Sequence, residues 1–142
     1  MYKIIIKDRD NKEYAIIENL DYASTFKKRL IGLMFKKEFN GLIFKQKKRH
    51  KILSSIHTSF MKTTIDILYI NSNMEIQEIT TLKPWKIYIP LKSNIKYIIE
   101  LPENTIKRLN IKQMQKVVIK NEKTKNKQTQ KHNPICNEHY KK

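Results

Sequence analysis

Residues 56–70 hold the side chains whose types could do chemistry in this chain. The stretch reads Ile-His-Thr-Ser-Phe-Met-Lys-Thr-Thr-Ile-Asp-Ile-Leu-Tyr-Ile, with one imidazole and one carboxylate among apolar residues. If Thr64–Ile70 is a strand, Asp66 shares a face with two large aliphatic side chains. A carboxylate buried there must be hydrogen-bonded or paired, or its pKa must rise. If residues 52–61 pair with that strand as a hairpin, His57 lies close to Asp66, and such a couple can orient an imidazole as a general base.

The same residues also support a purely structural interpretation. Asp66 would then anchor turn amides or a hydroxyl group, and His57 would occupy a polar niche. The sequence favours this interpretation, because no second acid and no obvious nucleophile accompany the pair. The nearby hydroxyl groups lack a surrounding Gly-x-Ser-x-Gly elbow; they belong to Ser54, Ser55, Thr58 and Thr63. A hydrolase that uses His57 and Asp66 stays open as an alternative function.

Trp85, the only tryptophan, adds an aromatic ring that a site could use. It alternates with Ile87 and Ile89, so the pattern predicts core packing as the first interpretation. The second interpretation is a surface clamp for a ligand, held rigid by the neighbouring Pro84. We therefore hypothesise a binding pocket lined by five residues, which are His57, Thr58, Met61, Asp66 and Trp85.

A dense basic run, Lys45-Gln-Lys-Lys-Arg-His-Lys51, lies between two predicted strands and is expected to form a hairpin loop. Its candidate phosphate-binding residues are Lys45, Lys47, Lys48, Arg49 and Lys51. Such a patch can bind nucleic acid when aromatic rings nearby stack on bases. The other interpretation is a solvated loop tip that protects a sheet edge from pairing.

The formal net charge of +17 bears on the same question. Seven Lys against two Glu give residues 120–142 a net charge of +5, which leaves +12 on the first 119 residues. A field of this sign attracts nucleic acid or acidic surfaces. Compositional drift is the competing explanation, since Lys, Ile and Asn are abundant and only two Gly occur. Binding of nucleic acid, RNA in particular, is therefore kept as an alternative function.

The C-terminal segment contains His132, Cys136 and His139 in a His-x₃-Cys-x₂-His arrangement. A closed structural zinc site needs four ligands, and the sequence offers no evident fourth. We therefore predict no metal site and no cofactor. With a single cysteine, an intrachain disulfide is impossible, which fits a reducing compartment.

Hydrophobic periodicity predicts a mainly β domain. Alternation over residues 2–7, the turn at Asp8–Asn11 and a returning strand at Glu13–Glu18 indicate an N-terminal hairpin. Apolar spacing of helical type predicts one packed helix near residues 22–34, and a helical turn is plausible at Asn104–Leu109. Further short strands are expected at Gly41–Lys45, Ile52–Phe60, Thr64–Ile70, Glu75–Thr81, Trp85–Ile89, Tyr97–Leu101 and Val117–Lys120. Many short strands of this spacing, mostly antiparallel, indicate a small β-barrel or a two-sheet sandwich.

Length and composition bound the organisation of the chain. The 142 residues predict one domain over residues 1–120. Residues 121–142 are rich in Lys, Asn, Gln and Thr, and we expect a disordered basic tail. The N-terminus lacks the apolar region of a secretory signal, and no apolar run reaches the roughly 18 residues of a membrane span. We therefore expect a cytoplasmic protein without a membrane segment.

Several ordered motifs resemble a known family. They are Leu30-Ile-Gly-Leu-Met-Phe-Lys36, Gly41-Leu-Ile-Phe44, the segment 56–70, Leu82-Lys-Pro-Trp85 and Ile99-Glu-Leu-Pro102. The chain resembles the domain-of-unknown-function family 192, and the residues around Thr58 and Pro84 are similar to its archaeal branch. The resemblance covers roughly residues 20–120. This chain has Met114-Gln115 where relatives usually show Gly-Asp.

The resemblance implies a compact, mainly β fold with a packed helix, and it implies no activity. The residues themselves favour a binding or structural module with no demonstrated catalysis. Its partner is left open, with a small ligand, a protein and nucleic acid all compatible.

Overall fold

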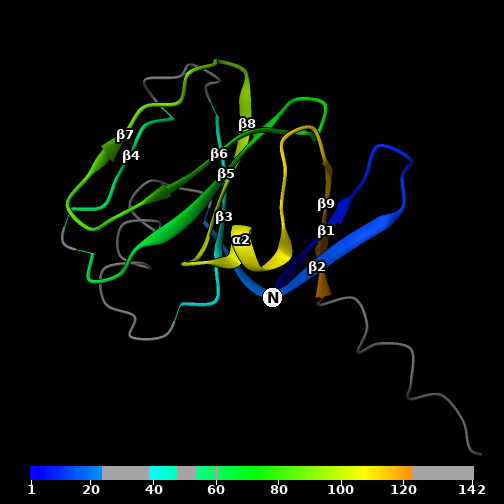
Figure 1. The fold of residues 1–142 in the computed structure, drawn as a ribbon, viewed down its shortest axis with the longest axis horizontal. Coiled ribbons are helices and arrows are strands. Elements are labelled where there is room, and N and C mark those ends of the chain that lie inside the picture. Colours follow the sequence, from blue (N-terminus) through cyan, green and yellow to red (C-terminus); the bar gives the residue numbers. More distant parts are fainter. Residues whose placement is uncertain (24–38, 48–53, 60, 123–142) are drawn as a thin grey trace, which may run out of the picture.

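The computed structural model describes residues 1–23, 39–47, 54–59 and 61–122. Within these ranges the chain is mainly β, with one short helix (Figure 1). The elements are β1 (Tyr2–Lys7), β2 (Glu13–Ala23), β3 (Leu42–Lys45), β4 (Ile56–His57), β5 (Ile65–Asn71), β6 (Ile76–Leu82), β7 (Ile87–Tyr88), β8 (Ile95–Pro102), α2 (Thr105–Leu109) and β9 (Lys116–Asn121).

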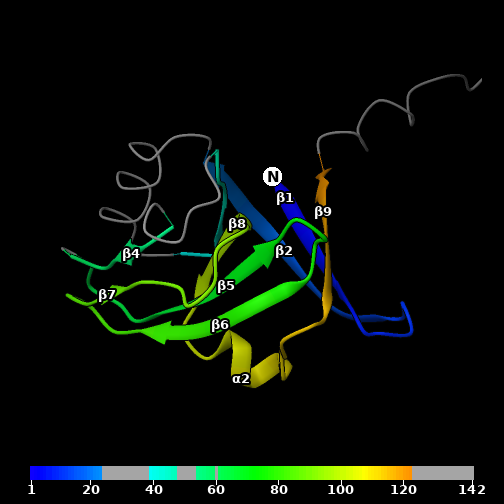
Figure 2. The same ribbon diagram turned by 90° about the horizontal axis from the view of Figure 1, so that it is seen from above.

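Nine of the described segments form two sheets. The larger sheet has the strand order β6-β5-β8-β3-β2-β1-β9, and β4 pairs with β7 in a separate two-stranded sheet. All neighbours are antiparallel except β2 and β3. This confirms the predicted mainly β class with mostly antiparallel strands. In Figures 1 and 2, β4 and β7 lie at one end of the molecule and β1, β2 and β9 at the other.

The larger sheet curves strongly but does not close into a barrel. Its two outer strands approach each other only where Glu75 forms an isolated bridge with Lys116. Three backbone hydrogen bonds of 2.8 Å support that approach, joining residues 74 and 76 to residues 114, 115 and 117. The turn before β9 uses Met114 at φ 70, a left-handed conformation adopted here without glycine. A tight turn therefore forms with Met114-Gln115 in place of the Gly-Asp that the resemblance leads one to expect.

The central strands bury both of their faces. Along β5, Leu68 and Ile70 point into one cluster, whereas Ile65, Ile67 and Tyr69 point into the other. The first cluster also receives Ile106 and Leu109 of α2, and we call it the α2-side core. The second receives Tyr88 of β7, and we call it the β7-side core. Because side chains alternate along a strand, the predicted facial alternation of β5 is confirmed.

A β-bulge lets β2 contribute to two different pairings. Its first part pairs with β1 and its last three residues pair with β3. Between these parts, Asn19 adopts φ 60, and the register with β1 shifts there by one residue. An extra residue of this kind bends the strand and increases its twist.

Gly41 lies where β2 meets β3. Its φ of 138° is one that residues with a Cβ rarely adopt, and a Cβ there would collide with the Leu20 side chain. The carbonyl oxygen of Gly41 accepts a hydrogen bond of 3.0 Å from the Asp21 N–H. Glycine is therefore required at this position for both conformational and steric reasons.

Several sequence predictions need correction at the level of elements. Tyr22 and Ala23, where a helix was expected to begin, are the last residues of β2, and residues 24–34 lie outside the described part. The short helix α2 confirms the helical turn expected at Asn104–Leu109. The tail beyond residue 122, with its His and Cys residues, also lies outside the described ranges.

Candidate functional site

The structure separates the two residues of the hypothesised His–Asp couple. β4, which contains His57, pairs with β7 and not with β5, so the predicted hairpin between residues 52–61 and Thr64–Ile70 is wrong. β5 is paired on both edges, with β6 and with β8. Asp66 shares its face with Leu68 on the α2-side core. Pairing between segments distant in the chain has overridden the short connection that suggested a hairpin.

Asp66 has two hydrogen-bond donors of its own. The Thr81 hydroxyl donates to Oδ1 at 2.8 Å, and the N–H of Ile106 donates to Oδ2 at 2.8 Å. The carboxylate is buried and lies at the start of α2, whose N-cap residue Asn104 makes no side-chain capping bond. Asp66 therefore satisfies a helix N–H from 40 residues away. This agrees with the interpretation of Asp66 as an anchor for turn amides or a hydroxyl group.

Thr58 is buried and organises the turn that contains Trp85. Its hydroxyl donates to the Lys83 carbonyl oxygen at 2.6 Å and accepts from the Lys86 N–H at 2.9 Å. Its own N–H donates to the Lys86 carbonyl oxygen at 2.8 Å, and its carbonyl oxygen accepts from the Trp85 N–H at 3.0 Å. The same carbonyl oxygen accepts from the Met61 N–H, and Met61 packs into the β7-side core. Thr58 thus holds the Trp85 turn directly, and Met61 ties the same carbonyl oxygen to the β7-side core.

Trp85 is not part of the core, which corrects the first interpretation of its alternation with Ile87 and Ile89. Its side chain is 63% exposed, and its backbone has φ 60. A bulky residue at positive φ is a conformational outlier that the surrounding structure must hold in place. The hydrogen bonds from Thr58 do this. The strand expected at Trp85–Ile89 is correspondingly limited to Ile87–Tyr88.

The residues after Trp85 continue an outward-facing apolar row. Ile87, Ile89 and Leu91 are 70%, 52% and 79% exposed. We call Trp85, Ile87, Ile89 and Leu91 the apolar edge. Tyr88 and Pro90 turn the other way, because Tyr88 packs against the β7-side core and Pro90 is buried, whereas Lys86 is exposed. The segment therefore carries apolar side chains on both of its faces, and only one face is covered in the described structure.

Glu78 anchors the far end of the same segment. It lies on β6 opposite Tyr69, and it is 5% exposed. The Tyr88 hydroxyl donates to Oε1, and the N–H of Leu91 donates to Oε2 at 3.0 Å. Burial, the hydrogen bond to Glu78 and the charge of that carboxylate together raise the pKa of Tyr88 to about 12. The Tyr88 hydroxyl therefore keeps its proton over the physiological range.

The remaining predicted residues can be placed only in part. Lys45 and Lys47 are exposed, while Lys48, Arg49 and Lys51 lie outside the described residues. The basic run does not connect a hairpin, because β3 pairs with β2 and β8 and β4 belongs to the other sheet. His57 is half-buried in β4, with Ile87 as its cross-strand neighbour.

Comparison with known proteins identifies the family. The model of the domain of unknown function 192, described as "Uncharacterized ACR", matches residues 5–119. The chain belongs to this family. Among DUF192 relatives, the UPF0127 protein of Pyrococcus furiosus is 42% identical over 90 residues, which covers 63% of this chain and 77% of the relative. The UPF0127 protein of Pyrococcus horikoshii is 48% identical over 80 residues, covering 56% and 69%. These archaeal relatives confirm the resemblance to the archaeal branch.

Two solved structures are similar to this member of the DUF192 family. A Sinorhizobium meliloti 1021 protein, described as a candidate transcription regulator, has a TM-score of 0.71 at 18% identity and covers 82% of this chain and 92% of its own. A protein of unknown function from Novosphingobium aromaticivorans DSM 12444 has a TM-score of 0.67 at 16% identity, covering 82% and 83%. At these identities the likeness shows the shared fold.

Two features of the site were missed at the level of sequence. Local patterns mark Glu78 only as a strand residue, and they do not indicate that Ile87 and Leu91 are exposed. One signal was available, because residues 83–92 contain three Lys, two Pro and no acidic residue. Such a segment cannot lie wholly in a core.

In the ranges that the structure describes, no helix has the length and apolar content needed to cross a membrane.

Proposed function

We propose that this protein is a binding module whose contact surface is the apolar edge, and that its partner is an extended, acidic polypeptide segment carrying apolar side chains. The observation that carries the proposal is the anchoring of an exposed apolar row at both ends. Thr58 fixes the turn at Trp85, and Glu78 fixes Tyr88 and Leu91. A segment held in this way has lost its conformational freedom before a partner arrives, which lowers the entropic cost of binding.

The composition of the apolar edge suits a protein contact. Single exposed apolar residues are common on protein surfaces, but here four large exposed ones fall within seven consecutive residues. Tryptophan is among the residue types that contribute most binding energy in interfaces, particularly where a rigid setting presents it. Trp85 lies at one end of the row, and its turn is hydrogen-bonded to Thr58, which is buried.

The charge around the apolar edge selects the chemistry of the partner. Lys83, Lys86 and Lys92 are exposed within the same stretch, and residues 83–92 contain no Asp or Glu. The net charge of +17 adds a long-range field of the same sign. Complementary charge at an interface speeds association and rejects partners of like charge. An acidic segment with alternating apolar side chains therefore complements both features of this surface.

The hydrolase alternative has less support from the described geometry. Asp66 is buried on the α2-side core with both oxygens hydrogen-bonded, while His57 lies in the other sheet beside Ile87. In the proposed binding site, Trp85 is a contact residue, Thr58 and Met61 support it, and His57 borders the edge through β7. Asp66 belongs instead to the anchoring of α2.

Trp85 offers a direct test, because it is the only tryptophan and its fluorescence reports on the edge alone. The purified chain is titrated with a synthetic peptide that alternates Leu or Ile with Glu, and with a peptide in which every Glu is Lys. We expect a saturable blue shift of the emission with the acidic peptide and none with its charge-reversed form.

A double variant and a matched control locate the contact. Ile87→Ser with Leu91→Ser should weaken binding at least about tenfold, since each removes an exposed apolar contact of the row. Met114→Ser serves as the control, because Met114 is 48% exposed in the turn before β9 and does not belong to the apolar edge. The substitutions are at exposed positions, so each should change the free energy of unfolding by less than about 0.5 kcal/mol.

Two results would contradict the proposal. One is equal binding of both peptides, or equal binding by the double variant and the wild type. The other is concentration-dependent self-association, measured by sedimentation velocity and abolished by the double variant, because a second copy of the chain would then occupy the edge.

A further inference from the structure

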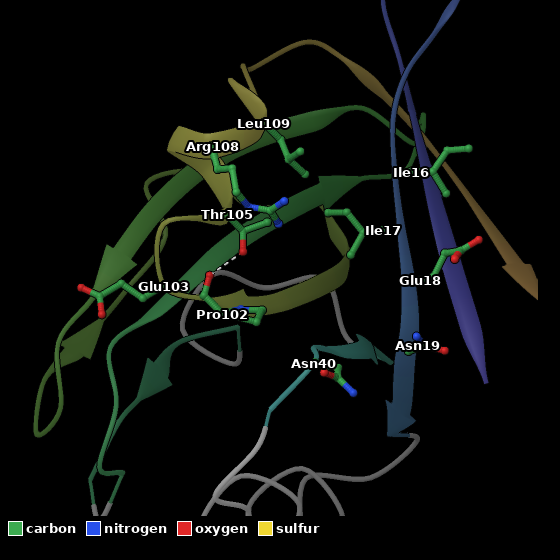
Figure 3. A pocket seen from close by; sticks show the side chains of 10 residues that line it. All are labelled: Ile16, Ile17, Glu18, Asn19, Asn40, Pro102, Glu103, Thr105, Arg108 and Leu109. Carbon is green, nitrogen blue, oxygen red and sulfur yellow. Dashed lines mark hydrogen bonds between the residues drawn. The ribbon is translucent and has the colours of Figure 1, made fainter.

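The surface of the molecule is hollowed between β2 and α2. The hollow has a volume of about 680 Å³, within the range of small-molecule sites. None of the four residues of the apolar edge lines it. As Figure 3 shows, one wall comes from β2 and its bulge, and the other comes from the end of β8 and from α2. We call this hollow the β2–α2 groove.

The bulge in β2 determines which side chains reach the β2–α2 groove. Ile17 pairs with Ile4 of β1 and packs at the margin of the α2-side core, so its side chain faces inward. By alternation Glu18 projects from the opposite face of β2, and Figure 3 shows it pointing away from Ile17. Together with Leu109 and Pro102, Ile17 gives the groove apolar walls, and the amide of Asn40 lies at its lower rim in the same view.

Arg108 supplies the charge inside the β2–α2 groove. Its guanidinium group extends from α2 toward β2, whereas the carboxylate of Glu103 points out to the other side (Figure 3). Within the part of the chain that the structure describes, Arg108 forms no ion pair. A guanidinium group has five donors in a planar fork that matches a carboxylate with two parallel hydrogen bonds.

We infer that the β2–α2 groove binds a carboxylate group attached to an apolar body, with Arg108 as the anion-binding residue. The carboxylate pairs with the guanidinium group, and the apolar body lies against Ile17, Leu109 and Pro102. Inorganic phosphate lacks the apolar body, so it makes only the contact with the guanidinium group and should bind more weakly than the carboxylate. The ligand is either a free monocarboxylic acid or the C-terminus of an apolar peptide.

This site is independent of the proposed function. It uses other residues on a different part of the fold, so loss of peptide binding at the apolar edge would not affect it. The test is therefore made on the full chain with different probes.

The ¹⁵N-labelled chain is titrated separately with hexanoate, hexanol, hexylamine and inorganic phosphate. Binding is monitored in ¹H–¹⁵N NMR spectra. A short apolar peptide, with a free and with an amidated C-terminus, distinguishes the two sources of the carboxylate. We expect hexanoate or the free peptide to shift the signals of Ile17, Asn40 and Arg108 saturably. Arg108→Gln should weaken that binding about tenfold or more, because it removes a charge-assisted, two-pronged hydrogen bond. Lys107→Gln is the control, since it removes a neighbouring exposed charge of α2 outside the groove.

Selective binding by either carboxylate with loss only in Arg108→Gln would support the site. Equal binding of hexanol or hexylamine, tighter binding of phosphate, or equal losses in the two variants would overturn it. Absence of any localised shift with millimolar hexanoate and millimolar free peptide would overturn it as well.

Discussion

The segment after β8 and the segment after β6 are both tied to the sheet by a buried carboxylate. Asp66 accepts the N–H of Ile106 at the start of α2, and Glu78 accepts the N–H of Leu91 beyond β7. Each carboxylate also accepts a hydroxyl, from Thr81 and from Tyr88. The two anchors lie on opposite faces of the central strands. The apolar side chains of the two segments nevertheless point in opposite directions.

α2 turns Ile106 and Leu109 into the α2-side core, whereas the segment after β6 holds Ile87 and Leu91 in solvent. Anchoring alone therefore does not decide whether apolar side chains become core. α2 lies over an apolar face of the sheet, and its own apolar side chains cover that face. Across the sheet, Tyr88 and Pro90 already provide the inward-facing side chains of their segment, and the alternate residues have to point outward. The first region is a closed structural joint, and the second has the properties of a presented surface.

Among the substitutions that test this comparison, replacing Asp66 should lower the free energy of unfolding most. Asp66→Ala leaves the Ile106 N–H and the Thr81 hydroxyl without their acceptor in a buried place, and we expect a loss of about 2–4 kcal/mol in the free energy of unfolding. Asp66→Asn keeps an acceptor oxygen and should cost less. Urea denaturation measures both.

Asp10→Ala is the matched control, because its exposed carboxylate makes only local contacts with Lys12, a 3.7 Å ion pair and a 3.4 Å hydrogen bond from the backbone N–H. It should change stability by less than about 0.5 kcal/mol. If Asp66→Ala were no more destabilising than Asp10→Ala, Asp66 would not be an anchor.

An intermediate effect is expected at Thr58. Thr58→Val preserves the shape of the side chain but removes the hydroxyl that bonds Lys83 and Lys86, which should cost about 1–3 kcal/mol. Thr58→Ser retains the hydroxyl and should recover most of that loss. Because the same bonds hold the Trp85 turn, the anisotropy of Trp85 fluorescence should fall in Thr58→Val and not in Thr58→Ser. An unchanged anisotropy in Thr58→Val would show that the edge is ordered by other contacts.

The smallest effect is confined to alkaline pH. The pKa of Tyr88 is raised from 10.0 to about 12, so the folded chain retains this proton where the unfolded chain releases it. Its contribution to stability is complete below pH 10 and is lost as the pH rises through about 12. The difference between the tyrosinate absorbance of the wild type and that of Tyr88→Phe should therefore have its midpoint near 12. A difference curve centred near 10 would mean that Glu78 does not hold the Tyr88 hydroxyl.

Part of this structure could be predicted from local patterns. The N-terminal hairpin, the strand at Thr64–Ile70 and the helical turn at Asn104–Leu109 depend on neighbouring residues, and the structure contains each of them. The role of Asp66 also followed in outline, since a carboxylate between aliphatic side chains must find donors. Which donors it finds could not be predicted, because Ile106 lies 40 residues further along the chain.

The prediction for Trp85 failed for a definable reason. Alternation shows that Trp85, Ile87 and Ile89 share a face, but it does not say whether that face is covered. Around Tyr88 both faces of the segment are apolar, so the pattern allows either orientation. The left-handed φ of Trp85 had no local signal either, since positive φ normally requires Gly, Asn or Asp.

The sequence by itself determined the mainly β class, the two-sided apolar character of β5 and the resemblance to a family. These properties depend on residue type and short-range spacing. Only the tertiary structure decided that β4 pairs with β7 and that Asp66 and His57 lie in different sheets. It also decided that the apolar edge faces outward and that the β2–α2 groove forms on another part of the fold. Those outcomes depend on pairing between segments that are distant in the sequence. Whether one face of a strand is buried depends on which strand or helix packs against it.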